Sequence, residues 1–363
     1  MLVIINKSEL LDKLSLVERA IPGRANFALI DGIYVKMEGD SLTLCANNLE
    51  MAIKASTGLV NGEGGEAVIF PKRFIQIAKQ LPGDKVEITV KDDRATVKSG
   101  NSVFKLNCIN AEEFPLFDES YQEKPFFEVE GQALKEMFSK TAFCVAIDMN
   151  KQIFQGVLMQ NDAEEGLTCI ATDTYRLSMY EELKIEYPEP FEIIVPGKLL
   201  NEVGKIIADN DIVRVYVDGK EIFFTTNDYK ISCGLLNGKF PDLKNAFPKN
   251  AQTGVKVNKH DLSATIGRAM LLSEKGKSMV SLSIGEEEIT VKTQSESGAM
   301  NESLPIGFKG ETIEQVLING RFLVEGMKAF DKDDLTIWFS GDTGPVVIGG
   351  KGFKHLMLPI KLA

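Results

Sequence analysis

The sequence is poor in the residue types that form reactive centres. Its 363 residues include only two histidines, His260 and His355, and one tryptophan. The five cysteines lie far apart, and no two of them form a Cys-x-x-Cys pair. This spacing argues against a disulfide framework or a metal site, and favours thiols that act as small apolar side chains in a reducing compartment. We therefore expect no catalytic site, no metal and no cofactor.

Long apolar runs are also missing. None approaches the roughly 20 residues that a membrane span needs. The first apolar run, in Met1–Lys7, is too short for a signal peptide and reaches a charged residue at once. The sequence therefore predicts a soluble cytoplasmic protein with no membrane partner.

Positive charge is in the minority. Lysine and arginine number 41 against 52 aspartate and glutamate, which gives a net charge of −11 and a pI near 5.0. A chain this acidic is no general nucleic-acid binder, so any DNA binding requires basic residues gathered on one face. Its length and its 44% hydrophobic content are enough for two or three cores.

A strand followed by an amphipathic helix occurs three times. The apolar helix faces begin at Leu10, Leu134 and Leu262, in steps of 124 (134 − 10) and 128 (262 − 134) residues. The expected faces are Leu10, Leu14 and Val17; Leu134, Met137, Phe138 and Thr141; and Leu262, Ile266 and Met270. We expect the first of these helices to run to about Ala20.

A second helix in each third confirms the period. The segments 70–81, 195–206 and 318–329 match one another, with Pro71 and Pro196 expected in a first helical turn. Alternating strands follow at 85–90, 212–217 and 335–339. The sequence predicts an α+β chain of three repeated domains, 1–122, 123–251 and 252–363, each with two helices packed on antiparallel sheet.

The most informative stretch is Ala171–Ser178, Ala-Thr-Asp-Thr-Tyr-Arg-Leu-Ser. A Thr-Asp-Thr turn between two strands is ordinary, because short polar side chains bond to their own backbone. The turn is followed by an aromatic ring, a guanidinium and an isobutyl group, in Tyr175, Arg176 and Leu177. Residues of these types anchor peptides in grooves.

With Asn47–Met51, Phe240-Pro-Asp and the terminal Leu358-Pro-Ile-Lys-Leu, the three repeats resemble the bacterial DNA polymerase III beta subunit, the replicative sliding clamp. The resemblance runs along essentially the whole chain. It implies a head-to-tail homodimer, a ring of six similar domains that encircles duplex DNA without reading its sequence. It also implies a processivity factor in DNA replication, with the polymerase III alpha subunit, the clamp loader and other replication and repair proteins as partners.

The resemblance further implies a peptide-binding groove between the second and third repeats. Carried over residue by residue, its walls are Phe154, Gly156, Thr172, Thr174, Tyr175, Arg176, Leu177, Pro241, Ala246, Asn319, Phe322, Val346, Leu358, Pro359, Ile360, Lys361 and Leu362. The family often has glycine or serine, then histidine, at the positions of Thr174 and Tyr175. A family arginine soon after Phe-Pro-Asp is replaced here by Asn245, and Ala363 is one residue beyond the usual end.

Every expected helix carries lysine or arginine, and the basic residues on these helices or flanking their ends would face DNA in such a ring. They are Arg19, Arg24, Lys72, Arg73, Lys79, Lys135, Lys140, Lys198, Lys205, Lys259, Arg268, Arg321 and Lys328. The alternative is that they belong to solvated surface faces. Family placement puts the dimer interface at Phe74, Phe104, Leu106, Leu271 and Leu272, with Lys72, Arg73 or Lys105 near Glu296 or Glu302.

Two other functions stay open at this point. One is a scaffold that polymerises head to tail without DNA, against which the basic helices and the terminal Leu-Pro-Ile-Lys-Leu weigh. The other is a hydrolase that uses Asp173, although turn formation explains that residue better. The main prediction is a non-enzymatic clamp.

Overall fold

The computed structural model describes residues 1–24, 27–58, 61–147, 149–162, 166–187, 189–248, 252–273, 278–350 and 352–361. The chain forms two compact units. The first contains residues 1–135, 185–189 and 202–235, and the second contains residues 136–184, 190–201 and 236–363. Two helices, α3 (Gly131–Thr141) and α4 (Gly197–Ile206), have residues in both units.

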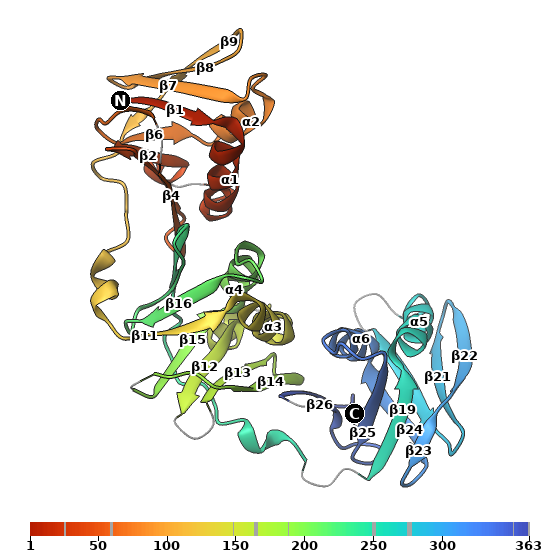
Figure 1. Cartoon of the computed structure of the whole chain (residues 1–363). Helices are drawn as coiled ribbons and strands as arrows, with labels where there is room; N and C mark the ends of the chain where they lie inside the picture. Colours follow the sequence, from red (N-terminus) through yellow and green to blue (C-terminus); the bar gives the residue numbers. More distant parts are fainter. Residues whose placement is uncertain are drawn as a thin grey trace. The chain divides into compact units, whose positions relative to one another are not determined.

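The first unit holds two antiparallel sheets (Figure 1). The smaller has the order β5 (Asn61–Glu63), β1 (Leu2–Asn6), β7 (Lys85–Lys91), β8 (Arg94–Ser99) and β9 (Ser102–Asn107). The larger has the order β10 (Ile109–Asn110), β6 (Val68–Pro71), β2 (Gly32–Glu38), β3 (Ser41–Asn47), β4 (Met51–Thr57), β18 (Tyr229–Gly234), β17 (Glu221–Thr225), β16 (Ile212–Val217) and β11 (Phe126–Glu130). Helices α1 (Lys7–Val17) and α2 (Arg73–Gln80) pack together in this unit.

The larger sheet contains strands from two successive repeats. They meet where β4 pairs with β18, in a register that places Lys54 directly opposite Lys230. Two like charges at this spacing repel each other. Glu119, in the short 3-10 helix Glu119–Glu123, accepts hydrogen bonds from both lysine ammonium groups, at 2.5 Å and 2.7 Å. Partial burial raises the pKa of Glu119, but the two lysines outweigh it and lower that pKa to about 2.

The segment that carries Glu119 is anchored by aromatic packing. The Tyr121 ring is fully buried and stacks on Phe223, with ring centroids 3.9 Å apart and an interplanar angle of 10°. Tyr216 meets the Tyr121 ring edge-on at 5.1 Å. The expected boundary between residues 122 and 123 thus lies next to a residue that is packed onto the sheet.

We expect Glu119→Gln to destabilise the first unit by about 1 kcal/mol at neutral pH, because the two opposed lysines lose their counter-charge. The folded-state pKa lies below the ordinary value of 4.5, so this stabilisation is complete above that pH and is lost as the pH falls toward 2. Urea unfolding midpoints of wild type and variant should therefore converge on acidification. Glu123→Gln, an exposed residue of the same 3-10 helix, is the matched control, and an equal loss in both variants would contradict the assignment.

The second unit repeats this plan. Its larger sheet has the order β15 (Phe191–Pro196), β12 (Gly156–Asp162), β13 (Gly166–Thr172), β14 (Arg176–Leu183), β27 (Phe353–Met357), β26 (Val346–Gly350), β25 (Asp334–Phe339), β19 (Thr253–Asn258) and β23 (Gly307–Lys309). The smaller has the order β22 (Gly298–Pro305), β21 (Glu288–Ser295), β20 (Met279–Ile284) and β24 (Ile313–Asn319). Figure 1 shows α5 (Lys259–Met270) and α6 (Gly320–Lys328) side by side in this unit.

The predicted α+β class and helix placement are confirmed, with six α-helices in the described part of the chain. The predicted apolar faces of α1, α3 and α5 are buried, except that Met270 is only partly covered. The first helix ends at Val17, and a 3-10 turn, Glu18–Ala20, follows it. Two helices begin with a side-chain cap, because Asn258 and Asn319 accept hydrogen bonds from backbone N–H groups of the first turn.

The expectation for the two prolines is wrong by one or two residues. Pro71 and Pro196 are the last residues of β6 and β15, and the helices begin at Arg73 and Gly197. Each proline is paired with a glycine, Gly32 and Gly156 respectively. A Cβ on Gly156 would lie 2.3 Å from the Ile194 side chain, so glycine there permits close strand approach.

Candidate functional site

The Thr-Asp-Thr stretch forms a tight turn between β13 and β14. The Thr172 hydroxyl accepts a hydrogen bond from the Thr174 N–H at 3.0 Å and donates one to the Arg176 carbonyl at 2.6 Å. Asp173 Oδ1 accepts the N–H groups of Tyr175 and Arg176, each at 3.0 Å. Thr174 has φ = +78°, which is costly for a β-branched residue and is maintained by these side-chain contacts.

Two adjoining hollows border this turn. The first, of about 280 Å³, is lined by Phe154, Thr172, Thr174, Tyr175, Arg176, Leu177, Pro241, Leu243, Ala246, Leu356 and Leu358. The second, of about 700 Å³, is lined by Tyr175, Asn319, Phe322, Thr343, Pro345, Leu358, Pro359, Ile360 and Lys361. Tyr175 and Leu358 line both hollows, and the walls are mostly apolar with a few polar groups at the edge. Such a surface suits an extended peptide with apolar anchors.

The end of the chain bridges two elements of this site. The Leu358 N–H donates to the Tyr175 carbonyl at 2.9 Å, and the Ile360 N–H donates to the Leu317 carbonyl of β24 at 2.7 Å. Segment 358–361 therefore fixes one wall of each hollow. Leu362, predicted as a wall, and Ala363 lie outside the described residues.

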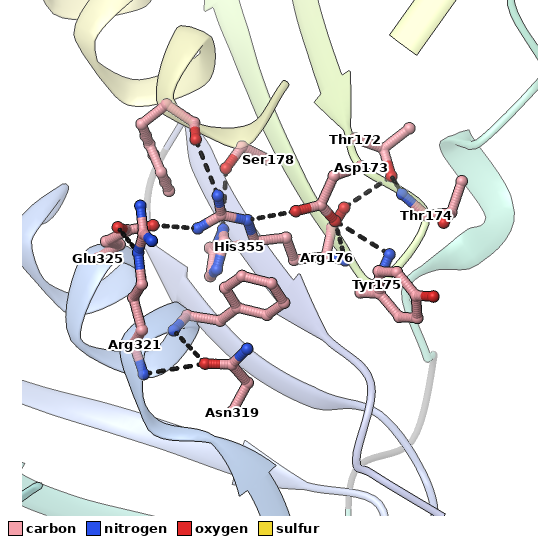
Figure 2. A network of polar contacts seen from close by, with 12 residues as sticks. Thr172, Asp173, Thr174, Tyr175, Arg176, Ser178, Asn319, Arg321, Glu325 and His355 are labelled. Carbon is pink, nitrogen blue, oxygen red and sulfur yellow. Dashed lines mark hydrogen bonds and ion pairs between the residues drawn. The ribbon is translucent and has the colours of Figure 1, made fainter. Parts of the chain in front are cut away.

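Arg176 is buried beneath the turn, with 5% of its surface exposed. Its Nε donates to Asp173 Oδ2 at 2.9 Å, one terminal nitrogen contacts Glu325, and the other donates to the Phe143 carbonyl at 3.0 Å (Figure 2). The guanidinium carbon also lies 4.3 Å from the centre of the Phe322 ring, a cation–π contact. The Asp173 carboxylate is thus used in the turn and this ion pair, which favours the structural interpretation over a hydrolase.

His355 of β27 is fully buried beside this network. Its Nδ1 lies 2.8 Å from the Ser178 hydroxyl, and Gly326 of α6 packs so closely that a Cβ there would be 2.3 Å from the imidazole. Burial, and to a smaller extent repulsion from Arg176, lowers the pKa of His355 to about 3. The ring is therefore neutral near pH 7 and serves as a packing element between β27 and α6.

The structure brings fourteen of the seventeen predicted groove residues to the walls of the hollows. Gly156 and Val346 are both buried and lie outside both linings. Four lining residues were missed: Leu243, Thr343, Pro345 and Leu356. Leu356 could have been found, because it lies two residues before Leu358 and so shares its face in an extended segment. The turn residues Thr343 and Pro345 carry no comparable sequence signal.

Most of the predicted DNA-facing cations form ion pairs within the chain. The pairs are Arg19–Glu202, Lys72–Asp31, Lys79–Glu18, Lys135–Asp209, Lys140–Glu136, Lys205–Glu202, Lys259–Asp333, Arg268–Glu302 and Arg321–Glu325. Arg24, Arg73, Lys198 and Lys328 are exposed. Lys140 is the exception in burial, with 9% of its surface exposed, and it also contacts Asp331.

The predicted interface residues differ in exposure. Phe74 is buried in the first unit and packs on Phe70, with ring centroids 4.7 Å apart, so it offers no surface to a second copy in this conformation. Phe104 and Leu106 are half-buried on β9, an edge strand. Leu271, directly after α5, is 84% exposed, whereas Leu272 is half-buried. Glu302 is already paired with Arg268.

In the described part of the chain, no helix is long and apolar enough to cross a membrane. The same residues contain no group of three or more histidine, cysteine, aspartate or glutamate side chains arranged to hold a metal ion.

Solved structures with this arrangement define its fold class. The DNA polymerase sliding clamp of Bacillus subtilis superposes with a TM-score of 0.94 at 25% identity, with 100% of both chains covered. The DNA polymerase beta subunit of Streptococcus pyogenes gives a TM-score of 0.95 at 23% identity over 100% of both chains. The fold is therefore that of a sliding clamp.

Sequence comparison gives the family. Models for the N-terminal, central and C-terminal domains of the DNA polymerase III beta subunit match residues 1–118, 128–242 and 244–361. The beta sliding clamp of Halalkalibacterium halodurans is 29% identical over 380 aligned positions, which cover 99% of each chain. The chain belongs to the DNA polymerase III beta subunit family.

The burial of His355 predicts a pH dependence. Below the unfolded-state pKa of about 6.5, the unfolded chain takes up a proton that the folded chain refuses until about pH 3. Stability should therefore fall as the pH drops through this window, by at most about 1.4 kcal/mol per pH unit from this group. The side chain of His355→Gln cannot take up a proton. This variant should have a lower free energy of unfolding than the wild type at neutral pH, but should lose less of it on acidification. Urea unfolding measures both quantities.

The second histidine supplies the control. His260 lies exposed at the start of α5 and pairs with Asp333. His260→Gln is the comparison variant, because it replaces an exposed imidazole instead of a buried one. Equal slopes for wild type and His355→Gln would show that the buried imidazole does not set the acid response.

Proposed function

We propose that this protein is a DNA sliding clamp that tethers a replicative polymerase and other replication and repair proteins to duplex DNA. The observation that carries the proposal is the family match over nearly the whole chain, combined with the pair of apolar hollows beside Tyr175. The chain acts as an accessory subunit in the cytoplasm, and the chemistry of synthesis belongs to its partner. The repeats 1–122, 123–251 and 252–363 are its domains.

The ring is a head-to-tail homodimer. Two exposed sheet edges support this assembly: β9 ends the small sheet of the first unit, and β22 ends the small sheet of the second. An open edge presents unpaired N–H and C=O groups that a strand of another copy can satisfy. Phe104 and Leu106 lie on β9, and Leu271 and Leu272 follow α5, so apolar contact supplements the edge pairing.

Duplex DNA is held by enclosure and weak charge attraction. All six helices contribute lysine or arginine, whereas the chain as a whole is acidic. A cation that already shares a carboxylate attracts a phosphate more weakly. No phosphate is then bound tightly, so the protein can slide along the DNA. Arg24, Arg73 and Lys328 are the strongest candidates for phosphate contact, because they are exposed and form no ion pair in the part of the chain that the structure describes. Lys140 contributes least, because it is buried.

The hollows receive a short extended peptide from each partner. Their apolar walls suit leucine and phenylalanine side chains, and Tyr175 and Leu358 lie where the two hollows meet. Because they share this site, the polymerase, the clamp loader and repair proteins compete for it.

Encirclement is tested by loading the protein onto plasmid DNA with its clamp loader and ATP. We expect retention on circular DNA at a salt concentration that strips ordinary phosphate contacts, and rapid loss once the plasmid is cut. Gel filtration through a large-pore column measures the bound fraction. Equal loss from both DNA forms would mean that the protein does not enclose DNA.

The interface is tested in the same assay. Leu271→Glu combined with Leu272→Glu should give a folded monomer that is lost from circles as fast as from linear DNA. Leu116→Glu is the control, because it charges another exposed leucine outside the proposed interface. A double variant that remains dimeric in sedimentation would refute the placement of the interface.

Tyr175→Ala should weaken binding of a synthetic peptide with leucine and phenylalanine anchors by about tenfold or more, as removal of a central aromatic does at other interfaces. Fluorescence anisotropy measures the Kd, and primer extension on a loaded circle measures polymerase stimulation. Phe27→Ala is the matched control, since both rings are 62% exposed. If Tyr175→Ala binds peptide as the wild type does, the peptide site lies elsewhere.

A further inference from the structure

Arg176 lines the first hollow but directs its hydrogen bonds into the protein. Asp173, Glu325 and the Phe143 carbonyl accept from its three nitrogens, and the Phe322 ring covers its guanidinium. These partners come from the turn, from α6 and from the segment after α3, so one side chain joins three elements (Figure 2). A guanidinium engaged in this way positions the wall of the hollow.

Glu325 is the partner from α6, and it lines neither hollow. One carboxylate oxygen contacts Arg176, and the other accepts from Arg321 Nε at 2.7 Å. Burial opposes its ionisation, but the hydrogen bonds from the two arginines outweigh it and hold the pKa of Glu325 below its ordinary value. The carboxylate therefore stays charged at neutral pH and holds Arg176 in place.

We propose that Glu325 is a positioning residue for peptide binding, acting through Arg176 on the 172–176 turn and on the Phe322 ring. This inference rests on the proposed function of the hollows. The physical path is short: Glu325 orients Arg176, Arg176 orients Asp173, and Asp173 accepts the N–H groups that set the direction of Tyr175. The same guanidinium is the surface against which Phe322, a wall of the second hollow, is seated.

Arg176 adds support from outside the turn to the hydrogen bonds within it. Thr174 sits at positive φ, where a β-branched residue is disfavoured, and Tyr175 is largely exposed. With Glu325 neutralised, Arg176 keeps Asp173 and the Phe143 carbonyl but loses its charged partner on α6. Tyr175 and Phe322 should then sample more orientations, so a peptide must order them on binding at a cost in affinity.

The test compares Glu325→Gln with Glu181→Gln. Glu181 is a matched carboxylate of the same unit, which pairs with Lys354 at 2.9 Å and is similarly exposed. We expect Glu325→Gln to raise the Kd of the labelled leucine- and phenylalanine-containing peptide about tenfold, and Glu181→Gln to leave it unchanged. Thermal unfolding of both variants reports whether stability falls equally. An unchanged Kd in Glu325→Gln would overturn the proposal.

A double-mutant cycle separates positioning from general loosening. If Glu325 acts through the turn, Glu325→Gln should cost much less in the Tyr175→Ala background than in the wild type. If the fold-losses in affinity of Glu325→Gln and Tyr175→Ala simply multiply in the double variant, Glu325 has only a structural role and the proposal fails. Glu325→Asp, which keeps the charge, should recover part of the affinity.

Peptide binding by the wild type and by Tyr175→Ala distinguishes this proposal from the function on which it rests. If the wild-type protein does not bind the peptide, or binds it with an affinity insensitive to Tyr175→Ala, the assignment of the hollows is wrong. If the wild type binds and Tyr175→Ala weakens binding, the hollows are correct and the Glu325 variants judge the positioning role alone.

Discussion

The candidate site depends on one strand pairing. β14 of the second repeat pairs with β27 at the end of the chain, with Arg176 opposite Met357 and Tyr180 opposite Phe353. The Leu358 N–H extends this ladder by bonding the Tyr175 carbonyl, so the turn and the terminal segment are aligned to within one residue. A slip of one residue would turn Leu356 and Leu358 to the opposite face and remove their side chains from the hollows.

The turn beside that pairing is a repeated element. In the first repeat, Asn47 Oδ1 accepts the Leu49 N–H at 2.7 Å, and Asn48 Oδ1 accepts the N–H groups of Glu50 and Met51. Leu49 has φ = +71°, close to the +78° of Thr174, the residue 125 positions later (174 − 49). The same turn conformation thus recurs in the two repeats with different side chains. In the second repeat it places Tyr175 at the border of the two hollows.

The sequence predicted what local patterns encode. Apolar spacing gave the buried faces of α1 and α3, and the Thr-Asp-Thr motif gave the turn before Arg176. The sequence could not show that Phe74 lies in a core. The spacing of apolar residues along a helix is the same whether an aromatic side chain is buried or half-exposed. Glu325 was missed for a different reason, since its partner Arg176 lies 149 residues away and only the folded chain joins them.

The ion pairs of the helices bear on how an acidic protein can hold DNA. At least nine of the thirteen predicted cations share a carboxylate, for example Lys79 with Glu18 and Arg268 with Glu302. Exposed pairs of this kind contribute about 0–1 kcal/mol each to stability, so their carboxylates can be exchanged for phosphates at little cost. If these cations face DNA as proposed, such exchange lowers the barrier between neighbouring positions on DNA. A surface of unpaired cations would bind more tightly but resist movement, whereas enclosure makes tight binding unnecessary.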